Sequence, residues 1–440
     1  MNADSRKKIG PVLAMMLVAS AMIGSGIFLL PASLGAIGSI SILAWIAASF
    51  GAALLAGVFC WLAILDPGAS GLFSYIRDAF GPGAGFVAGA LYWASCVVAI
   101  VAVALAVAGY LGVFIPAIAK PPGLAFGTIA AIWIFAGTNI LGPRFVAGLQ
   151  SWALALGLAP VFLAAVGGWL YFHPEVFMAS WNVTGGSALS VVPRAAVMVF
   201  WAFLGIETAI VLSTRVKNPG RNVPIATLGG LVIAAIIYMA ACAAIMGILP
   251  ASALAKSSAP FADAAAPILG ASIAGVFALC AMLKASGTLS ATILLTVETA
   301  ECEAVLGRLG PASPARPAHR VSTANIVFTA ALSSLIVWAS VSPTLARQFT
   351  IVTNVAVVLS LLVYGSASLA LLRLSRSLPQ SQRLWAWVLG VGGSLFSAAL
   401  IAVSEPDLLI YSAGSVLASF GAYAVLRARR AQLARAAIGA

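Results

Sequence analysis

The sequence predicts an all-α protein with many membrane-spanning helices, and composition is the first observation behind this prediction. Hydrophobic residues make up 62% of the 440 positions and charged residues only 8%, whereas a soluble protein carries about 25% charged residues. The second observation is that apolar runs of at least about 18 residues, long enough to cross a bilayer as a helix, recur along the chain. A membrane β-barrel would instead show alternating segments of about ten residues.

Twelve membrane spans are expected, and no loop between them is long enough to hold a soluble domain. The first apolar stretch continues too far to be the core of a cleaved signal peptide. The third and eighth spans are long and are expected to tilt. The spans leave tails at residues 1–10 and 428–440 and are expected at residues 11–34, 40–65, 83–116, 124–141, 147–172, 190–213, 223–249, 265–298, 321–341, 349–373, 385–403 and 408–427.

The basic residues predict the orientation of these spans. The formal net charge is +12, but the basic residues occur in short clusters between spans, which is typical of membrane topology and not of a nucleic-acid surface. Of the 23 Lys and Arg residues, 18 fall on the side of both tails, 4 fall on the opposite side and Lys284 lies within a span. Because basic loops stay in the cytoplasm, both termini are expected there.

The residue patterns of other function classes are missing from the sequence. Five cysteines are scattered without the close spacing of a metal site, so we expect them to pack as small apolar side chains. The expected spans contain no His, the chain has no H-E-x-x-H motif, and no G-x-x-x-x-G-K-[ST] loop is present to bind ATP. We therefore expect no enzyme, no metal and no cofactor, and we favour a secondary transporter over a channel, a pump or a receptor.

The first expected span contains a segment that disfavours a continuous helix. Gly24, Ser25 and Gly26 lie mid-span within AMIGSGIFLLP, residues 21–31, and glycine is a poor helix former. Small residues at this depth can allow two helices to pack closely. Alternatively, the helix unwinds there, because a broken helix is tolerated where it lines a cavity, and its free N–H groups can bind an anionic group.

The sixth expected span carries a second interruption. The stretch WAFLGIETAIVLS, residues 201–213, has Gly205 mid-span and Glu207 two residues later. A charged side chain at the bilayer centre costs about 2.5–3.5 kcal/mol on insertion scales, so we interpret Glu207 as functional, with a structural hydrogen bond to a neighbouring helix as the alternative. Interruptions in spans 1 and 6 are expected if residues 11–172 and 190–373 form two inverted five-helix repeats, followed by two extra helices at 385–427.

These stretches resemble a known family. GSGIFLLP, WAFLGIE and VKNPGRNVPIATLGG (residues 216–230) are similar to the basic amino acid/polyamine antiporters of the amino acid–polyamine–organocation superfamily, as are LYWASC, NILGPRF and SAPFADA. The resemblance covers most of the chain and is strongest from residue 10 to 265. It implies the LeuT-type fold with twelve helices, the bacterial inner membrane, exchange of an amino acid for its decarboxylated amine, and a possible homodimer. Substrate and lipid bilayer are the other expected partners.

The resemblance also implies which residues bind the substrate. The glycine-serine-glycine triplet would bind a carboxylate, and carbonyl groups of both interrupted spans would bind an α-ammonium. Trp201 matches an aromatic gate on the outer side, Tyr92 matches a phenol that closes the cytoplasmic side, and Glu207 matches an acidic residue implicated in pH response. The expected substrate-binding residues are Ala21, Met22, Ile23, Gly24, Ser25, Gly26, Tyr92, Cys96, Ile100, Trp201, Ala202, Phe203, Leu204, Glu207, Thr292 and Asn354.

Three of these positions depart from the family's arginine/agmatine exchanger and leave the substrate open. Ile100, Thr292 and Asn354 stand where that exchanger has an asparagine, a tryptophan and a serine, which predicts a wider and less aromatic pocket. Glu207 and the family resemblance favour cationic amino acids or polyamines. Ile100, Thr292 and a positive charge near the pocket favour the alternative, a sodium-independent exchanger or proton-coupled symporter of neutral amino acids.

Lys284 is a fourth departure, in the stretch CAMLKASGTLSAT of the eighth span. Lys284, Thr288 and Thr292 are spaced by four residues, so they share one helical face. Sodium-coupled LeuT-type relatives bind sodium between this region and the first span, and some sodium-independent relatives place a lysine of the fifth span there, which this chain lacks. We therefore expect Lys284 to replace that cation and to act with Thr288 and Glu207 in proton or cation coupling. Snorkelling and a static salt bridge are the alternatives.

Overall fold

The structure is a computed structural model that describes residues 9–24, 26–67, 69, 71–208, 216–301 and 322–438. Ser25, most of the N-terminal tail and the end of the sixth expected span after residue 208 lie outside the described residues. Within the described ranges the secondary structure is helical, apart from an isolated bridge between Ile9 and Val216.

Nine helices in the described part of the chain are long and apolar enough to cross a membrane, as the composition predicts. They are α3 (Ser41–Leu65), α5 (Pro82–Leu111), α6 (Gly123–Ile140), α7 (Pro143–Val166) extended by η3 (Gly167–Tyr171), α11 (Pro219–Ile248), α14 (Ala271–Glu301), α16 (Leu345–Leu374), α17 (Gln380–Ala402) and α18 (Pro406–Ile438). Three further apolar helices are shorter, and they are α1 (Pro11–Met22), α9 (Ala188–Phe200) and α15 (Thr323–Ala339).

Short helices lie between these longer ones. They are η1 (Gly26–Phe28), α2 (Leu30–Gly35), α4 (Leu72–Phe80), η2 (Pro116–Ile118), α8 (Pro174–Ala179), η4 (Trp201–Phe203), α12 (Ala251–Leu254), α13 (Pro260–Leu269) and η6 (Ser375–Ser377). The expected eighth span, 265–298, is wrong at its start. Gly270 has φ +81°, a conformation that favours glycine, so it ends α13 before α14 begins.

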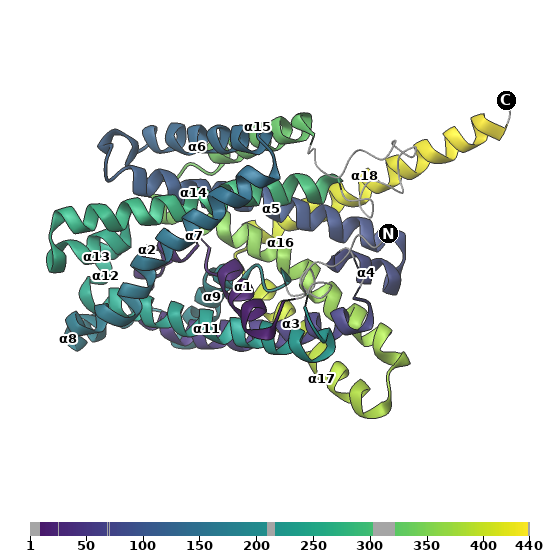
Figure 1. The fold of residues 1–440 in the computed structure, drawn as a ribbon, viewed down its shortest axis with the longest axis horizontal. Coiled ribbons are helices and arrows are strands. Elements are labelled where there is room, and N and C mark those ends of the chain that lie inside the picture. Colours follow the sequence, from purple (N-terminus) through teal and green to yellow (C-terminus); the bar gives the residue numbers. More distant parts are fainter. Residues whose placement is uncertain are drawn as a thin grey trace.

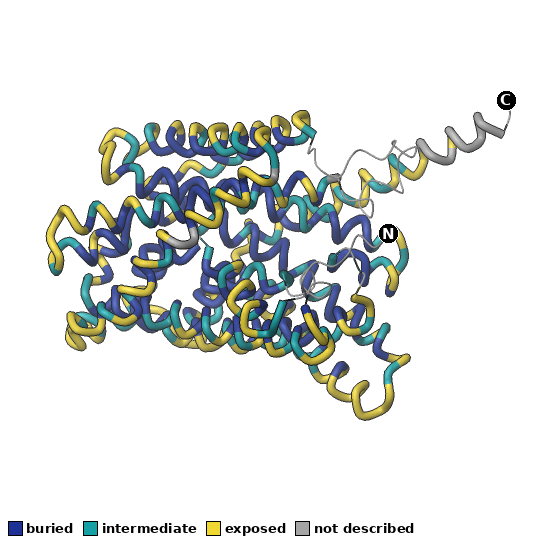
Figure 2. The backbone as a smooth tube through the Cα atoms, viewed as in Figure 1, coloured by how far each residue is buried: buried dark blue, intermediate teal, exposed yellow. Residues whose placement is uncertain are grey.

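The helices form a bundle with a buried centre and an apolar surface. Of the residues in the most apolar part of α5, 78% are buried. The corresponding share for α18 is 17%, because α18 extends away from the bundle (Figure 1). Figure 2 shows the same contrast as buried backbone at the centre and exposed backbone on the outer helices. An outer surface with large apolar side chains on α17, such as Trp385 and Leu395, is suited to lipid. Near the centre η1 contacts η4, and α5 and α16 pack beside them.

Candidate functional site

The first interruption separates α1 from η1. The N–H of Ile23 still donates to the carbonyl of Ala19 at 2.8 Å, but the N–H of Gly24 turns back to the carbonyl of Met22 at 2.6 Å. Tyr238 of α11 donates its hydroxyl to the same carbonyl at 2.5 Å. Helical hydrogen bonding therefore stops at the glycines, and a phenol from a neighbouring helix secures the broken end.

The second interruption follows η4. Leu204 is extended, and Gly205 has φ +104°, a conformation that favours glycine. The N–H of Gly205 donates to Oε2 of Glu207 at 3.0 Å, instead of continuing the helix. A Cβ atom on Gly205 would lie 3.4 Å from the carbonyl oxygen of Ala21. The two interruptions thus approach each other closely.

The carboxylate of Glu207 is held by hydrogen bonds from two other helices. The hydroxyl of Tyr92, in α5, donates to Oε1 at 2.8 Å, and the hydroxyl of Tyr364, in α16, donates to Oε2 at 2.6 Å. Together with the N–H of Gly205, these donors compensate for the loss of water around the carboxylate. Glu207 therefore ties α5, α16 and the second interruption to one another.

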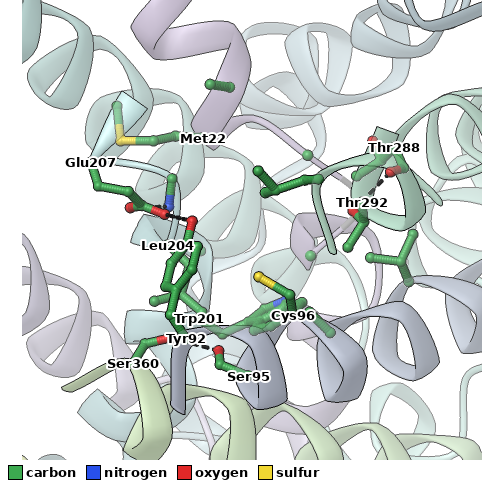
Figure 3. A pocket seen from close by; sticks show the side chains of 18 of the residues that line it. Met22, Tyr92, Ser95, Cys96, Trp201, Leu204, Glu207, Thr288, Thr292 and Ser360 are labelled. Carbon is green, nitrogen blue, oxygen red and sulfur yellow. Dashed lines mark hydrogen bonds between the residues drawn. The ribbon is translucent and has the colours of Figure 1, made fainter. Parts of the chain in front are cut away.

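A cavity of about 170 Å³ lies between the two interruptions and helices α5, α14 and α16 (Figure 3). Most of the residues expected from the sequence line it, and they are Ala21, Met22, Gly24, Gly26, Tyr92, Cys96, Trp201, Ala202, Leu204, Glu207, Thr288 and Thr292. Trp201 covers the first interruption, because a Cβ atom on Gly26 would overlap the indole nitrogen. The indole also meets the ring of Phe349 edge-on, at 6.4 Å between centroids.

Other expected residues do not line the cavity. Ile23, Ile100 and Phe203 are buried among apolar side chains. Asn354 is also buried, and its Oδ1 atom has no hydrogen-bond partner among the described residues. Lys284 is only 3% exposed and is absent from the lining.

Lys284 packs at the contact between α14 and α7. A Cβ atom on Gly157 of α7 would overlap the Cβ of Lys284, so this glycine makes room for the lysine. In the ranges that the structure describes, the ammonium has neither a hydrogen bond nor an ion pair. One turn further along α14, the Cγ2 atom of Thr288 lies 3.6 Å from the position of a Cβ on Gly24. The face that Lys284 and Thr288 share therefore reaches the first interruption.

Comparison with known proteins identifies the family of the chain. A family model described as amino acid permease matches residues 9–425. The chain belongs to this family. It is 38% identical to the cadaverine/lysine antiporter of Escherichia coli over 267 residues, so the match spans 61% of this chain and 60% of that relative. It is also 30% identical to the putrescine transporter PotE of Escherichia coli over 426 residues, 96% of each chain, and to that of Haemophilus influenzae over 424 residues.

The cavity of this permease contains residues that were not predicted from the sequence. Tyr364 is the tyrosine of the tenth expected span, and its position opposite Glu207 depends on the packing of α16. Ser95 and Ser360 also line the cavity, with 2.7 Å between their hydroxyl oxygens. Ala99, Val103 and Leu295 add apolar surface. The sequence offers one signal for Tyr364, Ser95 and Ser360: each has a polar group within a membrane span, and such a group needs a hydrogen-bond partner.

The charge of the permease cavity has one sign. Among the described residues that line it, only Glu207 has a charged side chain. No group of three metal-ligating side chains occurs in the described part of the chain. The fixed charge of the cavity therefore favours a cationic group over an anionic one.

Proposed function

We propose that this permease is a secondary active antiporter that exchanges a cationic amino acid for a polyamine by alternating access. The observation that supports this most directly is the cavity between two interrupted helices, with Glu207 as its charged side chain. The printed functions of the relatives, cadaverine/lysine antiport and putrescine transport, point to the same substrates. Interrupted helices that meet at a central site are typical of secondary transporters.

The amino acid's backbone groups would bind at the first interruption. The indole N–H of Trp201 lies against Gly26 and can donate to a carboxylate, together with backbone N–H groups that the helix no longer uses. Ser25 belongs to this proposed set, although it lies outside the described residues. Carbonyl groups of Ala21 and Ala202, on the two sides of the cavity, would accept from the α-ammonium.

Alternating access requires one gate on each side of the cavity. We assign the outer gate to Trp201, whose indole covers the first interruption. The cytoplasmic gate is assigned to Tyr92 and Glu207 together with Tyr364, because their hydrogen bonds tie α5 and α16 to the second interruption. Breaking this cluster would separate α5 and α16 from the second interruption.

The same proposal extends to the architecture. In the described residues, nine long and three short apolar helices overlap the spans expected from the sequence, which supports an assignment to twelve spans. We assign them to a LeuT-type fold, with inverted repeats at 11–172 and 190–373 and two further helices at 385–427. Both termini are placed in the cytoplasm of a bacterial inner membrane. The exposed aromatic residues of α17 and α18 provide a surface for a homodimer or for lipid.

Lys284 and Thr288 are proposed to act in coupling. A lysine that is 3% exposed and has no acidic partner in the described residues is unusual within a membrane. Its helical face reaches the first interruption, so its charge can influence the conformation of that segment. Because Lys284 does not line the cavity, its positive charge does not exclude a cationic substrate.

Counterflow in proteoliposomes tests the proposed function. Vesicles loaded with lysine, ornithine or arginine would be assayed for uptake of labelled lysine, with the corresponding amines, leucine and alanine as competitors. We expect cationic substrates inside the vesicle to stimulate uptake, and the amines to compete more strongly than leucine or alanine. Exchange of leucine or alanine without any response to cationic substrates would contradict the proposal. Repeating the assay with imposed proton or sodium gradients identifies the coupling ion.

A further inference from the structure

A second cavity opens on the apolar surface of the bundle. It has a volume of about 270 Å³ and lies between α7 with η3, α11, α13 and the start of α14. Leu170 and Leu163 on its rim are 84% and 49% exposed, whereas Ile245 and Phe261 form a buried inner wall. We call this cavity the lateral groove, because it leads from the surface suited to lipid into the core of the bundle.

The lining of the lateral groove is suited to hydrocarbon. Among the described residues that line it, Tyr171 is the one with a polar side chain, and it is 45% exposed at the rim. Leucine, isoleucine, phenylalanine, alanine and glycine residues form the rest of the lining. A charged ligand would lose its contacts with water there without replacement. The groove therefore disfavours the amino acids and amines proposed for the central cavity.

The position of the groove along the bundle corresponds to the depth of lipid chains. Figure 1 shows α8, α12 and α13 at one end of the bundle, opposite the end from which α18 extends. At this end Trp169 of η3 stacks on Phe172 at 4.9 Å between centroids, and two further aromatic rings of α8 and its end continue the row. Tryptophan residues of this kind are enriched at the level of the lipid headgroups. From there the groove extends inward to Leu163 of α7 and Phe277 of α14.

The inner wall of the groove contacts the first interruption. The ring of Phe261, in α13, meets the ring of Phe28, in η1, edge-on at 5.4 Å between centroids. Tyr110 of α5 donates its hydroxyl to the carbonyl of Phe28 at 3.0 Å and accepts from the N–H of Phe261 at 3.5 Å. Gly270 alone separates α13 from α14, so α13 can change its angle at one residue. The position of α13 is therefore linked to that of η1, which begins at Gly26.

We propose that the lateral groove binds one hydrocarbon chain of a membrane phospholipid, and that this chain stabilises the substrate-binding form of the first interruption. A chain between α13 and the pair α7 and α11 packs behind Phe261, so it holds α13 against η1. The hydroxyl of Tyr171, a rim residue, can donate to an ester or phosphate oxygen of the same lipid. The coupling rests on the proposed function, because it concerns substrate binding at the same interruption.

Gly167 provides a way to fill the groove from the protein side. It lines the groove, its φ of −74° is suitable for any residue, and a Cβ atom there would meet no atom within 4 Å. In Gly167→Leu the new side chain would take the place of the lipid chain. Gly148→Leu is the matched control, because Gly148 lies in α7 with equally open space but does not line the groove.

Lipid retention tests the binding of the chain. The purified full chain would be delipidated in detergent, titrated with palmitoyl-oleoyl phosphatidylethanolamine and measured by native mass spectrometry. We expect the wild type and Gly148→Leu to retain one lipid more than Gly167→Leu does. Equal retention by all three proteins would overturn the proposal. Occupation of the groove by free oleate or by detergent, with no additional phospholipid retained, would overturn it as well.

Lysine affinity tests the coupling. Dissociation constants for lysine would be measured by calorimetry with and without saturating phospholipid. We expect the lipid to lower the constant of the wild type by about fivefold or more, as is typical of coupling between two sites. Gly167→Leu should show a ratio of about one, because the lipid chain cannot enter. Phe261→Leu should retain the lipid but lose most of the effect, because its contact with Phe28 is smaller.

The outcomes separate the groove from the proposed function. If the wild type exchanges lysine but its affinity does not respond to the lipid, the coupling is wrong and the proposed function stands. The same conclusion follows if Gly167→Leu responds to the lipid as the wild type does. A wild type that retains the lipid but neither binds nor exchanges lysine or cadaverine contradicts the proposed function and the coupling together. Because Gly167→Leu alone carries both comparisons, poor folding of Phe261→Leu does not protect the proposal.

Discussion

Glu207 places a carboxylate inside an apolar bundle, and three donors from separate segments hold it there. Its two oxygens accept three hydrogen bonds from the protein and so have about one acceptor site left. The carboxylate is therefore a junction between helices as well as a source of negative charge for the cavity. This dual role explains why a costly residue lies so close to a glycine-based interruption.

The role of Tyr364 can be measured by removing its hydroxyl. Tyr364→Phe leaves Oε2 of Glu207 with the N–H of Gly205 as its donor. We expect the free energy of unfolding to fall by about 1–2 kcal/mol and the exchange rate to fall with it. Thermal unfolding in detergent and counterflow in proteoliposomes measure the two effects. Tyr423→Phe, on the outer helix α18, is the control, and equal effects of both variants would contradict the role given to Tyr364.

Gly26 provides a second prediction at this scale. A Cβ atom there would overlap the indole of Trp201, whereas Gly137 on α6 has open space around it. We expect Gly26→Ala to displace the indole and to lower exchange by about tenfold or more, since overpacking costs about 1–3 kcal/mol. Gly137→Ala should leave exchange at the wild-type rate. Wild-type counterflow by Gly26→Ala would show that exchange does not depend on the close contact between Gly26 and the indole of Trp201.

The sequence identified the residues of the two interruptions better than it identified the residues of other helices that contact them. Gly24, Gly205 and Glu207 are recognisable because glycine and a carboxylate are each unfavourable within a membrane span. Tyr364 reaches Glu207 only through the packing of α16, which no spacing along the chain reveals. Ile100 and Asn354 were expected to bind substrate, yet both are buried outside the lining, because a resemblance transfers position without side-chain direction.

At the scale of elements, the contact between α7 and α14 combines a glycine with a lysine. Gly157 leaves space for the stem of Lys284, so the two helices approach closely beside a charged side chain. The four-residue spacing of Lys284, Thr288 and Thr292 indicates that they share a face of α14, but it does not indicate which helix that face meets. The glycine opposite Lys284 was therefore not predicted.

Replacing Gly157 tests this close approach. In Gly157→Ala the new Cβ would overlap the Cβ of Lys284, and both atoms belong to parts of the chain that cannot rotate away. We expect the free energy of unfolding to fall by about 1–3 kcal/mol, as in other overpacked contacts. Gly148→Ala, in the same helix but with open space around it, should be neutral or slightly stabilising. Equal melting temperatures of the two variants would contradict the contact.

At the scale of the whole molecule, charge and hydropathy predicted the spans, because a bilayer imposes length and composition on every helix that crosses it. The same constraint does not determine how the helices are arranged around a cavity. Lys284 is the one basic residue that the predicted topology assigns to neither side of the membrane, so it links the whole-chain charge pattern to the local geometry. It is buried against α7, one turn from Thr288, and Thr288 reaches the first interruption, so Lys284 connects the proposed site to the packing of the bundle.

Lys284→Met keeps the length of the stem and removes the charge, so it tests coupling more directly than it tests packing. We expect exchange to fall by about tenfold or more and its dependence on external pH to change, because the helical face that reaches the first interruption would lose its buried charge. Lys256→Met, on an exposed loop residue, should reproduce the wild-type rate and pH profile. Counterflow at several external pH values, with melting temperatures measured in parallel, distinguishes coupling from misfolding. A folded Lys284→Met protein with the wild-type rate and pH profile would show that the lysine is only a packing residue between α7 and α14.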